Sequence, residues 1–342
     1  MEVLIFALKA LVVVIGFASI IILIAVVAAR ASQKSELEIE PLHKKHKDWA
    51  DFLKSLTASK EELKEEKKRA KAQKKAEKKE GKNKSTEDEV SQKKVFVLDF
   101  NGDMHAHQVD NLREEITAVL QTATAQDEVV VKVESPGGVV HSYGLAASQL
   151  MRIRDRGIPL TICVDQVAAS GGYLMACVAN KILCAPFAIV GSIGVVAQVP
   201  NFFRVLKKHD VDYKEYTAGD FKRTVSLLGE ITPQGEAKFQ ERLVDTHVLF
   251  KNFVQRFRPQ LDLAKVATGE YWFGEEALKL GLVDELRTSD DYLLSFEKDT
   301  PIFELTYEVK KSISDKLSEI AGQALSKALL KVWTRLETNR FL

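Results

Sequence analysis

Strand-like and helix-like segments alternate from Val95 onward, and this alternation constrains the fold more than any other feature of the sequence. Short β-prone runs alternate with stretches whose apolar residues have helical spacing, a pattern typical of βα units around a largely parallel sheet. We therefore predict a mixed α/β domain. The expected strands are 95–100, 128–133, 160–164, 182–184, 189–190 and 302–307, and the expected helices are 109–124, 143–153, 173–179 and 233–257.

The N-terminal segment is apolar and long. Residues 10–29 contain twenty residues without a charge, which is enough to span a bilayer core of about 30 Å. A secretory signal has a shorter apolar region of roughly 7–15 residues. We expect residues 1–31 to be an uncleaved transmembrane anchor, although Ala29-Arg30-Ala31 loosely resembles a cleavage site and leaves cleavage open. The apolar stretch 182–200 contains Pro186 and Gly191, and we interpret it as buried strand and turn rather than as a second span.

Residues 32–94 are expected to form a juxtamembrane helix followed by a charged spacer. Trp49, Phe52, Leu53 and Leu56 have helical spacing, which predicts a short amphipathic helix over 42–56 near the membrane. Residues 60–84 are almost entirely Lys, Glu, Ala and Gln, so this part cannot bury a core and is expected to be a solvated spacer. Contact with anionic lipid headgroups is an alternative for its basic residues. Nucleic-acid binding is not expected, because no aromatic residues are interleaved for base stacking.

The C-terminal segment 311–342 has an amphipathic pattern and is expected to form a terminal helix. Such a helix can pack on its own domain, on a partner protomer or on a membrane surface, and packing on protein is the default.

Composition excludes several classes of site. The formal net charge is +1, and the chain has three cysteines and seven histidines. An odd number of cysteines without motif spacing excludes a disulfide framework and gives no zinc pattern, so we interpret the cysteines as small buried hydrophobic residues. The histidines form no metal constellation, and no phosphate-binding or dinucleotide glycine motif is present. We therefore expect no metal and no cofactor.

Two segments about fifty residues apart suggest nucleophilic catalysis. Ser170 lies among small residues just before an apolar helix-like run, where helix N–H groups would face a developing charge. No histidine follows at a suitable spacing, but Lys222 does, and a serine paired with a lysine base is a known nucleophile. Such a lysine must lose its proton far below the ordinary pKa of about 10.4, which burial can achieve. The pair predicts acyl transfer, although each residue alone has an ordinary structural interpretation.

Two glycine-containing turns supply further candidates. Paired glycines in Ser135-Pro-Gly-Gly138 allow a backbone N–H to approach a ligand. The N–H of Gly138 or Gly137, together with that of Gly171, is a candidate oxyanion hole. Ser192, in the turn 191–194, is a candidate to orient the lysine. An ordinary turn remains the alternative interpretation of both segments.

Taken together and in this order, several segments resemble the SohB-like branch of the signal-peptide-peptidase (SppA) family of membrane serine peptidases. The resemblance covers most of residues 95–286. The matching stretches are 134–138, 167–173, 191–195, 219–223 and the sequence Trp-Phe-Gly-Glu-Glu-Ala-Leu-Lys-Leu-Gly-Leu-Val-Asp at 272–284.

The resemblance implies a ClpP/crotonase-like domain over residues 95–310, behind the N-terminal transmembrane helix and charged spacer. It implies a Ser–Lys dyad of Ser170 and Lys222, oxyanion donors at Gly138 and Gly171, and Ser192 close to the dyad. Relatives form rings, and in some of them the serine and the lysine come from neighbouring protomers. A homo-oligomeric ring is therefore expected, and a single protomer is expected to keep the two residues apart.

The resemblance also bears on the side of the membrane. The positively charged residues just after the apolar segment would by themselves favour a cytoplasmic domain, whereas the resemblance favours the periplasmic side of the bacterial inner membrane, which we expect.

The resulting hypothesis is a membrane-anchored serine endopeptidase. Its expected substrates are signal-peptide remnants and other unfolded or membrane-derived peptides, and its other expected contact is membrane lipid. Two alternatives are a crotonase-like acyl-CoA enzyme, which shares the fold and the oxyanion logic, and a non-catalytic membrane scaffold. The anchor and the Ser–Lys pair argue against the acyl-CoA enzyme.

Overall fold

The computed structural model describes residues 35–59, 92–296 and 300–309. The expected anchor, most of the charged spacer and the expected C-terminal helix lie outside the described residues. The larger of two compact units runs from Ile39 to Thr306 and contains the candidate site; the strand ends 35–38 and 307–309 group with the chain termini. Within the described ranges, no helix combines the length and the apolar character needed to cross a membrane.

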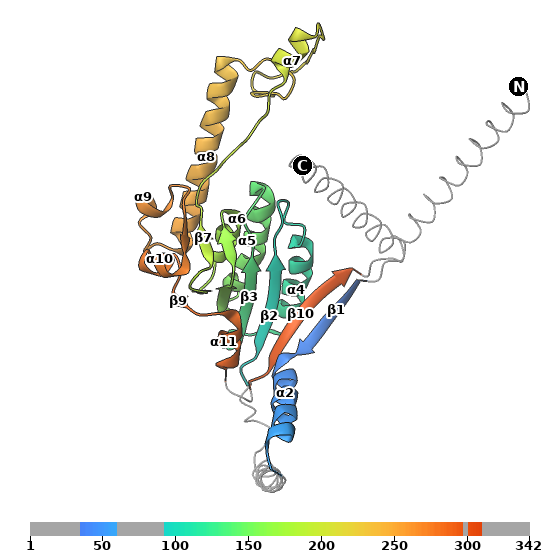
Figure 1. Ribbon diagram of the computed structural model, residues 1–342, viewed down its shortest axis with the longest axis vertical. Helices are drawn as coiled ribbons and strands as arrows, with labels where there is room; N and C mark the ends of the chain where they lie inside the picture. The colour runs from blue at the N-terminus through green and yellow to red at the C-terminus, as the bar shows by residue number, and fades with distance from the viewer. Residues whose placement is uncertain (1–34, 60–91, 297–299, 310–342) are drawn as a thin grey trace, which may run out of the picture. The chain divides into compact units, whose positions relative to one another are not determined.

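Seven strands form the main sheet in the order β1-β10-β2-β3-β4-β6-β9 (Figure 1). The pairings from β10 through to β9 are all parallel, which confirms the predicted mixed α/β class with a largely parallel sheet. The strands are β1 Ser35–Pro41, β2 Val95–Asn101, β3 Glu128–Glu134, β4 Leu160–Val164, β6 Lys181–Cys184, β9 Glu285–Leu286 and β10 Ile302–Val309.

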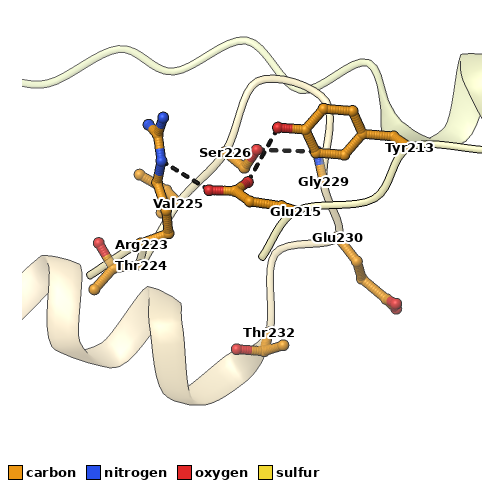
Figure 2. Close-up of a pocket in the computed structure, with 9 residues that line it drawn as sticks. All are labelled: Tyr213, Glu215, Arg223, Thr224, Val225, Ser226, Gly229, Glu230 and Thr232. Atoms are coloured by element: carbon orange, nitrogen blue, oxygen red, sulfur yellow. Dashed lines mark hydrogen bonds and ion pairs between the residues drawn. The ribbon is translucent and has the colours of Figure 1, made fainter. Parts of the chain in front are cut away.

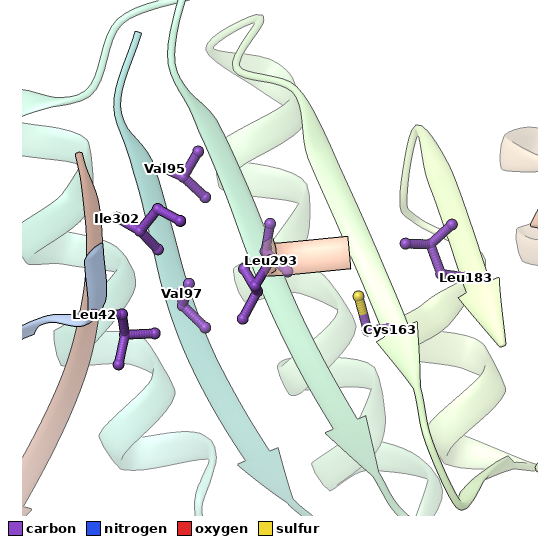
Figure 3. Packing of buried hydrophobic residues seen from close by; sticks show 8 residues of the cluster. Leu42, Val95, Val97, Cys163, Leu183, Leu293 and Ile302 are labelled. Carbon is purple, nitrogen blue, oxygen red and sulfur yellow. The ribbon is translucent and has the colours of Figure 1, made fainter. Parts of the chain in front are cut away.

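The central strands are buried on both faces, which explains their nearly continuous apolar sequences. One face of the sheet carries the hydrophobic cluster that Figure 3 shows. The cluster includes Leu42 and also Leu293 of α11 (Ser289–Leu294). Helices α4 (Val109–Thr122) and α5 (Val140–Asp155) pack against each other, and α4 packs on β2. The cluster consists of Leu42, Val95, Val97, Val130, Cys163, Leu183, Leu293 and Ile302.

A second, three-stranded sheet holds the residues around Ser170. Its order is β5-β7-β8, with β5 (Val167–Ala169) parallel to β7 (Ile189–Gly191) and β8 (Tyr271–Phe273) antiparallel to β7. A parallel bridge between Ser135 and Ala168 joins it to the end of β3. Strands β1, β5, β8 and β9 are not predicted from the sequence. Strands β5, β8 and β9 are runs of two or three residues, which give no periodic signal, and β1 lies in the segment where a helix and a spacer are expected. The stretch 182–200 contains the buried strands β6 and β7, as expected, whereas Phe187 and residues 196–200 are exposed.

The long helix α8 spans Pro233–Phe257, the range that the sequence predicts. Thr232 caps it by accepting a hydrogen bond from the Gly235 N–H at 3.1 Å, and Pro233 occupies the first turn. The amphipathic helix predicted over 42–56 is also present, as α2 Leu42–Thr57. The remaining helices are α6 Gly171–Ala176, α7 Phe203–Lys208, α9 Leu263–Val266 and α10 Gly274–Lys279.

The three cysteines are free and buried, as predicted. Burial raises the pKa of the Cys163 and Cys184 thiols to about 12, so both remain protonated and unreactive near neutral pH.

Candidate active site

Ser170 lies at the sharp turn between β5 and α6 and is half-buried. Its backbone has φ 52° and ψ −116°, a conformation that non-glycine residues rarely adopt and that is typically found at functional sites. The two following glycines allow close packing here. A Cβ on Gly171 would lie 2.4 Å from Cγ of Tyr143, and one on Gly172 would lie 2.6 Å from the Ser135 carbonyl oxygen. The local sequence Ala-Ser-Gly-Gly is therefore what this turn requires.

The turn 135–138 lies directly against the Ser170 turn. Gly137 has φ +87°, and a Cβ placed there would lie 2.7 Å from both the Gly171 nitrogen and the Ser170 Cβ. The Ser135 N–H donates to the Val167 carbonyl at 2.8 Å, and the Ala169 N–H donates back to Ser135 at 3.0 Å. The structure thus brings together the two turns that the sequence analysis proposed as nucleophile and oxyanion hole.

Gly138 is the next residue of the same turn and packs on the loop that follows β2. A Cβ at Gly138 would lie 2.1 Å from the Met104 carbonyl oxygen, and the Val139 N–H donates to that oxygen at 2.9 Å. Among the described residues, neither the Gly138 N–H nor the Gly171 N–H donates to a carbonyl or side-chain acceptor. Both donors are therefore available to an oxyanion, as an oxyanion hole requires.

Ser192 is the neighbour of Ser170 across the small sheet. Ala169 pairs with Gly191 in the parallel β5–β7 register, and the Ser170 N–H donates to the Gly191 carbonyl at 2.8 Å. Ser192 follows Gly191 with φ 51°, and its N–H donates to the Glu270 carbonyl at 2.7 Å. Ser170 and Ser192 therefore follow the carboxyl ends of two neighbouring parallel strands, β5 and β7, at the same end of the small sheet.

Lys222 does not lie beside the Ser170 turn; it lies on the loop between α7 and α8. Its N–H closes a turn onto the Gly219 carbonyl at 3.1 Å, and its side chain is exposed. The same loop encloses a pocket of about 250 Å³, where Arg223 forms a 2.8 Å ion pair with Glu215 and the Tyr213 hydroxyl donates to Glu215 at 3.1 Å (Figure 2). No hydrogen bond in the described part of the chain connects Lys222 to Ser170.

Helix α8 contacts both the Lys222 loop and the segment next to Ser192, so the distance between these contacts along the helix indicates how far apart the two segments lie. At its start, Gly235 packs on the Thr224 carbonyl, two residues after Lys222. Twelve residues further along, the His247 ring lies 3.2 Å from the Ile193 carbonyl, next to Ser192. At 1.5 Å per residue these two contacts are about 18 Å apart along the helix. Within one protomer, the Lys222 loop is therefore held away from the Ser170 turn.

Tyr143 supports the site and was missed by the sequence analysis. Its hydroxyl is hydrogen-bonded to Ser135 Oγ and donates to the Asp103 carbonyl at 2.7 Å. Burial raises the pKa of Tyr143, so the phenol stays a neutral donor. The Asp103 carboxylate accepts hydrogen bonds from the His107 side chain and backbone, which lower its pKa to about 2. No local sequence pattern marks Tyr143 as a site residue, because an apolar helix position explains it equally well.

Comparisons with known proteins point to a peptidase family. Residues 1–150 match the model of the peptidase family S49 N-terminal region, and residues 152–302 match that of peptidase family S49. The chain is 51% identical to a probable protease SohB of Haemophilus influenzae over 86% of this chain and 84% of that protein. It is 50% identical to a probable protease SohB of Buchnera aphidicola from Acyrthosiphon pisum, over 71% and 72% of the two chains. A putative signal peptide peptidase SppA of Enterococcus faecium is 27% identical over 66% of this chain and 70% of its own length.

Proposed function

Because this chain belongs to peptidase family S49, we propose that it is a serine endopeptidase in which Ser170 is the nucleophile and Lys222 the general base. The observation that carries the proposal is the Ser170 turn, where a non-glycine residue with φ 52° begins a helix and contacts Gly137. A serine hydroxyl beside two backbone N–H groups that have no acceptor among the described residues is an arrangement suited to acyl transfer.

In the proposed mechanism, Lys222 takes the Ser170 proton as Oγ attacks the peptide carbonyl. The Gly138 and Gly171 N–H groups stabilise the oxyanion, and Ser192 orients the lysine. Protonated Lys222 then donates its proton to the leaving amine. Water, activated by the same lysine, hydrolyses the acyl-enzyme.

We propose further that the dyad is completed between protomers of a ring. The 18 Å offset along α8 supports this, as does the apolar surface of the segment from α7 to α8. Tyr216 is 89% exposed and Leu249 is 65% exposed, and a neighbouring protomer would bury such residues. A ClpP/crotonase-like fold for residues 95–310 is part of the same proposal.

The proposed setting is the bacterial inner membrane, with residues 1–31 as anchor, 32–94 as juxtamembrane helix and spacer, and 311–342 as a terminal helix. The catalytic domain would face the periplasm and cleave signal-peptide remnants or unfolded peptides. Fusion of a periplasm-active reporter to the C-terminus tests the side of the membrane; a reporter active only in the cytoplasm would contradict the proposal.

The decisive experiment is cleavage of unfolded casein by the detergent-purified full chain, comparing Ser170→Ala and Lys222→Ala with the wild type. Both variants should lose activity by about 10⁴-fold or more, because each removes half of the reacting pair. Lys214→Ala is the matched control, since Lys214 is an exposed lysine of the same loop, and it should retain activity. Wild-type rates in either dyad variant with an unchanged oligomer would refute the assignment.

A further inference from the structure

Helix α2 carries a row of apolar side chains that is largely exposed. Trp49 is 57% exposed, Phe52 63%, Leu53 60% and Leu56 68%. Their spacing of three, four and seven residues from Trp49 places them on one face of the helix. Four large apolar side chains at this exposure form a contiguous patch of the kind that marks an interaction surface.

The first turn of α2 fixes the direction of this face. Leu42 is the one buried residue of α2 and belongs to the core cluster. The His43 ring lies 3.0 Å from the Ile302 carbonyl, and the Ile302 N–H lies 3.1 Å from the same ring nitrogen. Since Leu42 and Trp49 are seven residues apart, they share a face. The helix is thus docked by its first turn and extends beyond the sheet (Figure 1), so its apolar face continues past the core.

The charges around the row fit a lipid surface. Lys45 Nζ lies 5.4 Å from the centre of the Trp49 ring, and α2 contains four lysines against two aspartates. A tryptophan beside apolar residues, with lysines at the border, is the composition of helices that lie at the boundary of headgroups and acyl chains. An excess of lysine is complementary to anionic headgroups.

The position of α2 in the chain points to the same occupant. Helix α2 begins thirteen residues after Ala29, the end of the uncharged run 10–29. Seven of the intervening residues form β1, which leads directly into α2, so the start of α2 lies at most about 45 Å from the end of the uncharged run. A bilayer that holds the uncharged run is therefore within reach of α2.

We propose that the face of α2 formed by Trp49, Phe52, Leu53 and Leu56 docks on an anionic lipid bilayer surface. The docked face fixes the orientation of the α/β domain above the membrane. This proposal is independent of the protease assignment, because it concerns a surface that the proposed mechanism does not use.

Site-directed spin labelling of the full chain in lipid nanodiscs tests the proposal. The three native cysteines are buried with pKa values raised by burial, so a single exposed cysteine is labelled selectively. Leu53→Cys reports on the apolar face. Lys47→Cys is the matched control, because Lys47 is exposed and lies about 200° around the helix from Trp49. Both variants should unfold at the wild-type temperature, since both side chains are exposed.

In nanodiscs containing phosphatidylglycerol, the label at position 53 should be accessible to oxygen and protected from a water-soluble nickel chelate. The label at position 47 should show the opposite. The contrast should weaken in purely zwitterionic nanodiscs. Equal nickel accessibility at the two positions would overturn the proposal. Protection of position 53 from both reagents would also overturn it, because that result identifies a protein contact as the occupant.

Discussion

At the residue scale, the site depends on glycines that let two turns approach each other. Gly137 combines a φ of +87° with contact to Ser170 and Gly171. A side chain at position 137 would strain the backbone and push the 135–138 turn away from the Ser170 turn. The geometry of the proposed site therefore depends on the absence of a side chain at Gly137.

We expect Gly137→Ala to lower kcat/KM for casein by about 100-fold or more, because a displacement of about 1 Å has that effect on a reacting geometry. Gly144→Ala is the control. Gly144 lies in α5 with no neighbouring atom within 4 Å of an added Cβ, so alanine should leave activity unchanged and stabilise the helix by up to about 1 kcal/mol. Full activity of Gly137→Ala would show that the approach of the two turns is not needed.

At the element scale, α8 is joined to the core by a buried ion pair at its C-terminal end. Arg258 donates to both carboxylate oxygens of Asp284 at 2.8 and 2.7 Å and to the Gly281 carbonyl at 2.8 Å. Burial alone would lower the pKa of Arg258, but its hydrogen bonds and charge interaction with Asp284 raise it. The Arg258 side chain is only 4% exposed, so this charge depends on its partner.

We expect Asp284→Asn to lower the free energy of unfolding by roughly 3 kcal/mol, because it leaves the Arg258 charge buried without its counterion. Urea unfolding of the purified variant measures the loss. Lys265→Ala is the control, since its ion pair with Asp262 is exposed and should be worth less than about 1 kcal/mol. A similar small effect in both variants would contradict this account of how α8 is anchored.

Glu128, the first residue of β3, is expected to make the stability of the fold dependent on pH. Burial would raise the pKa of Glu128, but hydrogen bonds from Lys93, Tyr292 and Thr161 outweigh it and lower the pKa below the ordinary 4.5. A carboxyl group whose pKa is lowered by folding stabilises the fold above its unfolded pKa. That stabilisation is lost as the pH falls through the lowered value.

We therefore expect the wild type to lose stability below about pH 4.5, with a weaker pH dependence in Glu128→Gln. Urea unfolding at pH 7 and at successively lower pH values measures both slopes. Parallel curves for the two proteins would show that Glu128 does not contribute to the acid sensitivity.

At the scale of the whole molecule, the separation of Ser170 and Lys222 within one protomer is the central observation. If neighbouring protomers complete each other's sites, co-expressed Ser170→Ala and Lys222→Ala chains should regain activity. Random mixing at equal amounts restores both residues at about a quarter of the interfaces. Casein cleavage by the co-purified oligomer measures this recovery. A mixed oligomer without activity, beside an active wild type, would place both residues of the dyad in one chain.

Local features of this protein can be predicted from its amino-acid sequence. The strands at Val95, Glu128 and Leu160 and the bounds of α8 follow from apolar periodicity and from the cap at Thr232, which act over a few residues. The Ser170 turn follows in the same way from its small residues.

Contacts between distant segments cannot be predicted in this way, because they depend on how the elements pack. The β5–β7 register places Ser192 beside Ser170, and the contacts of α8 hold the Lys222 loop away. The residues in contact are 22 positions apart in the β5–β7 register, and 11 and 54 positions apart in the two contacts of α8. No local pattern encodes such contacts, because they arise only when the packed elements bring those residues together.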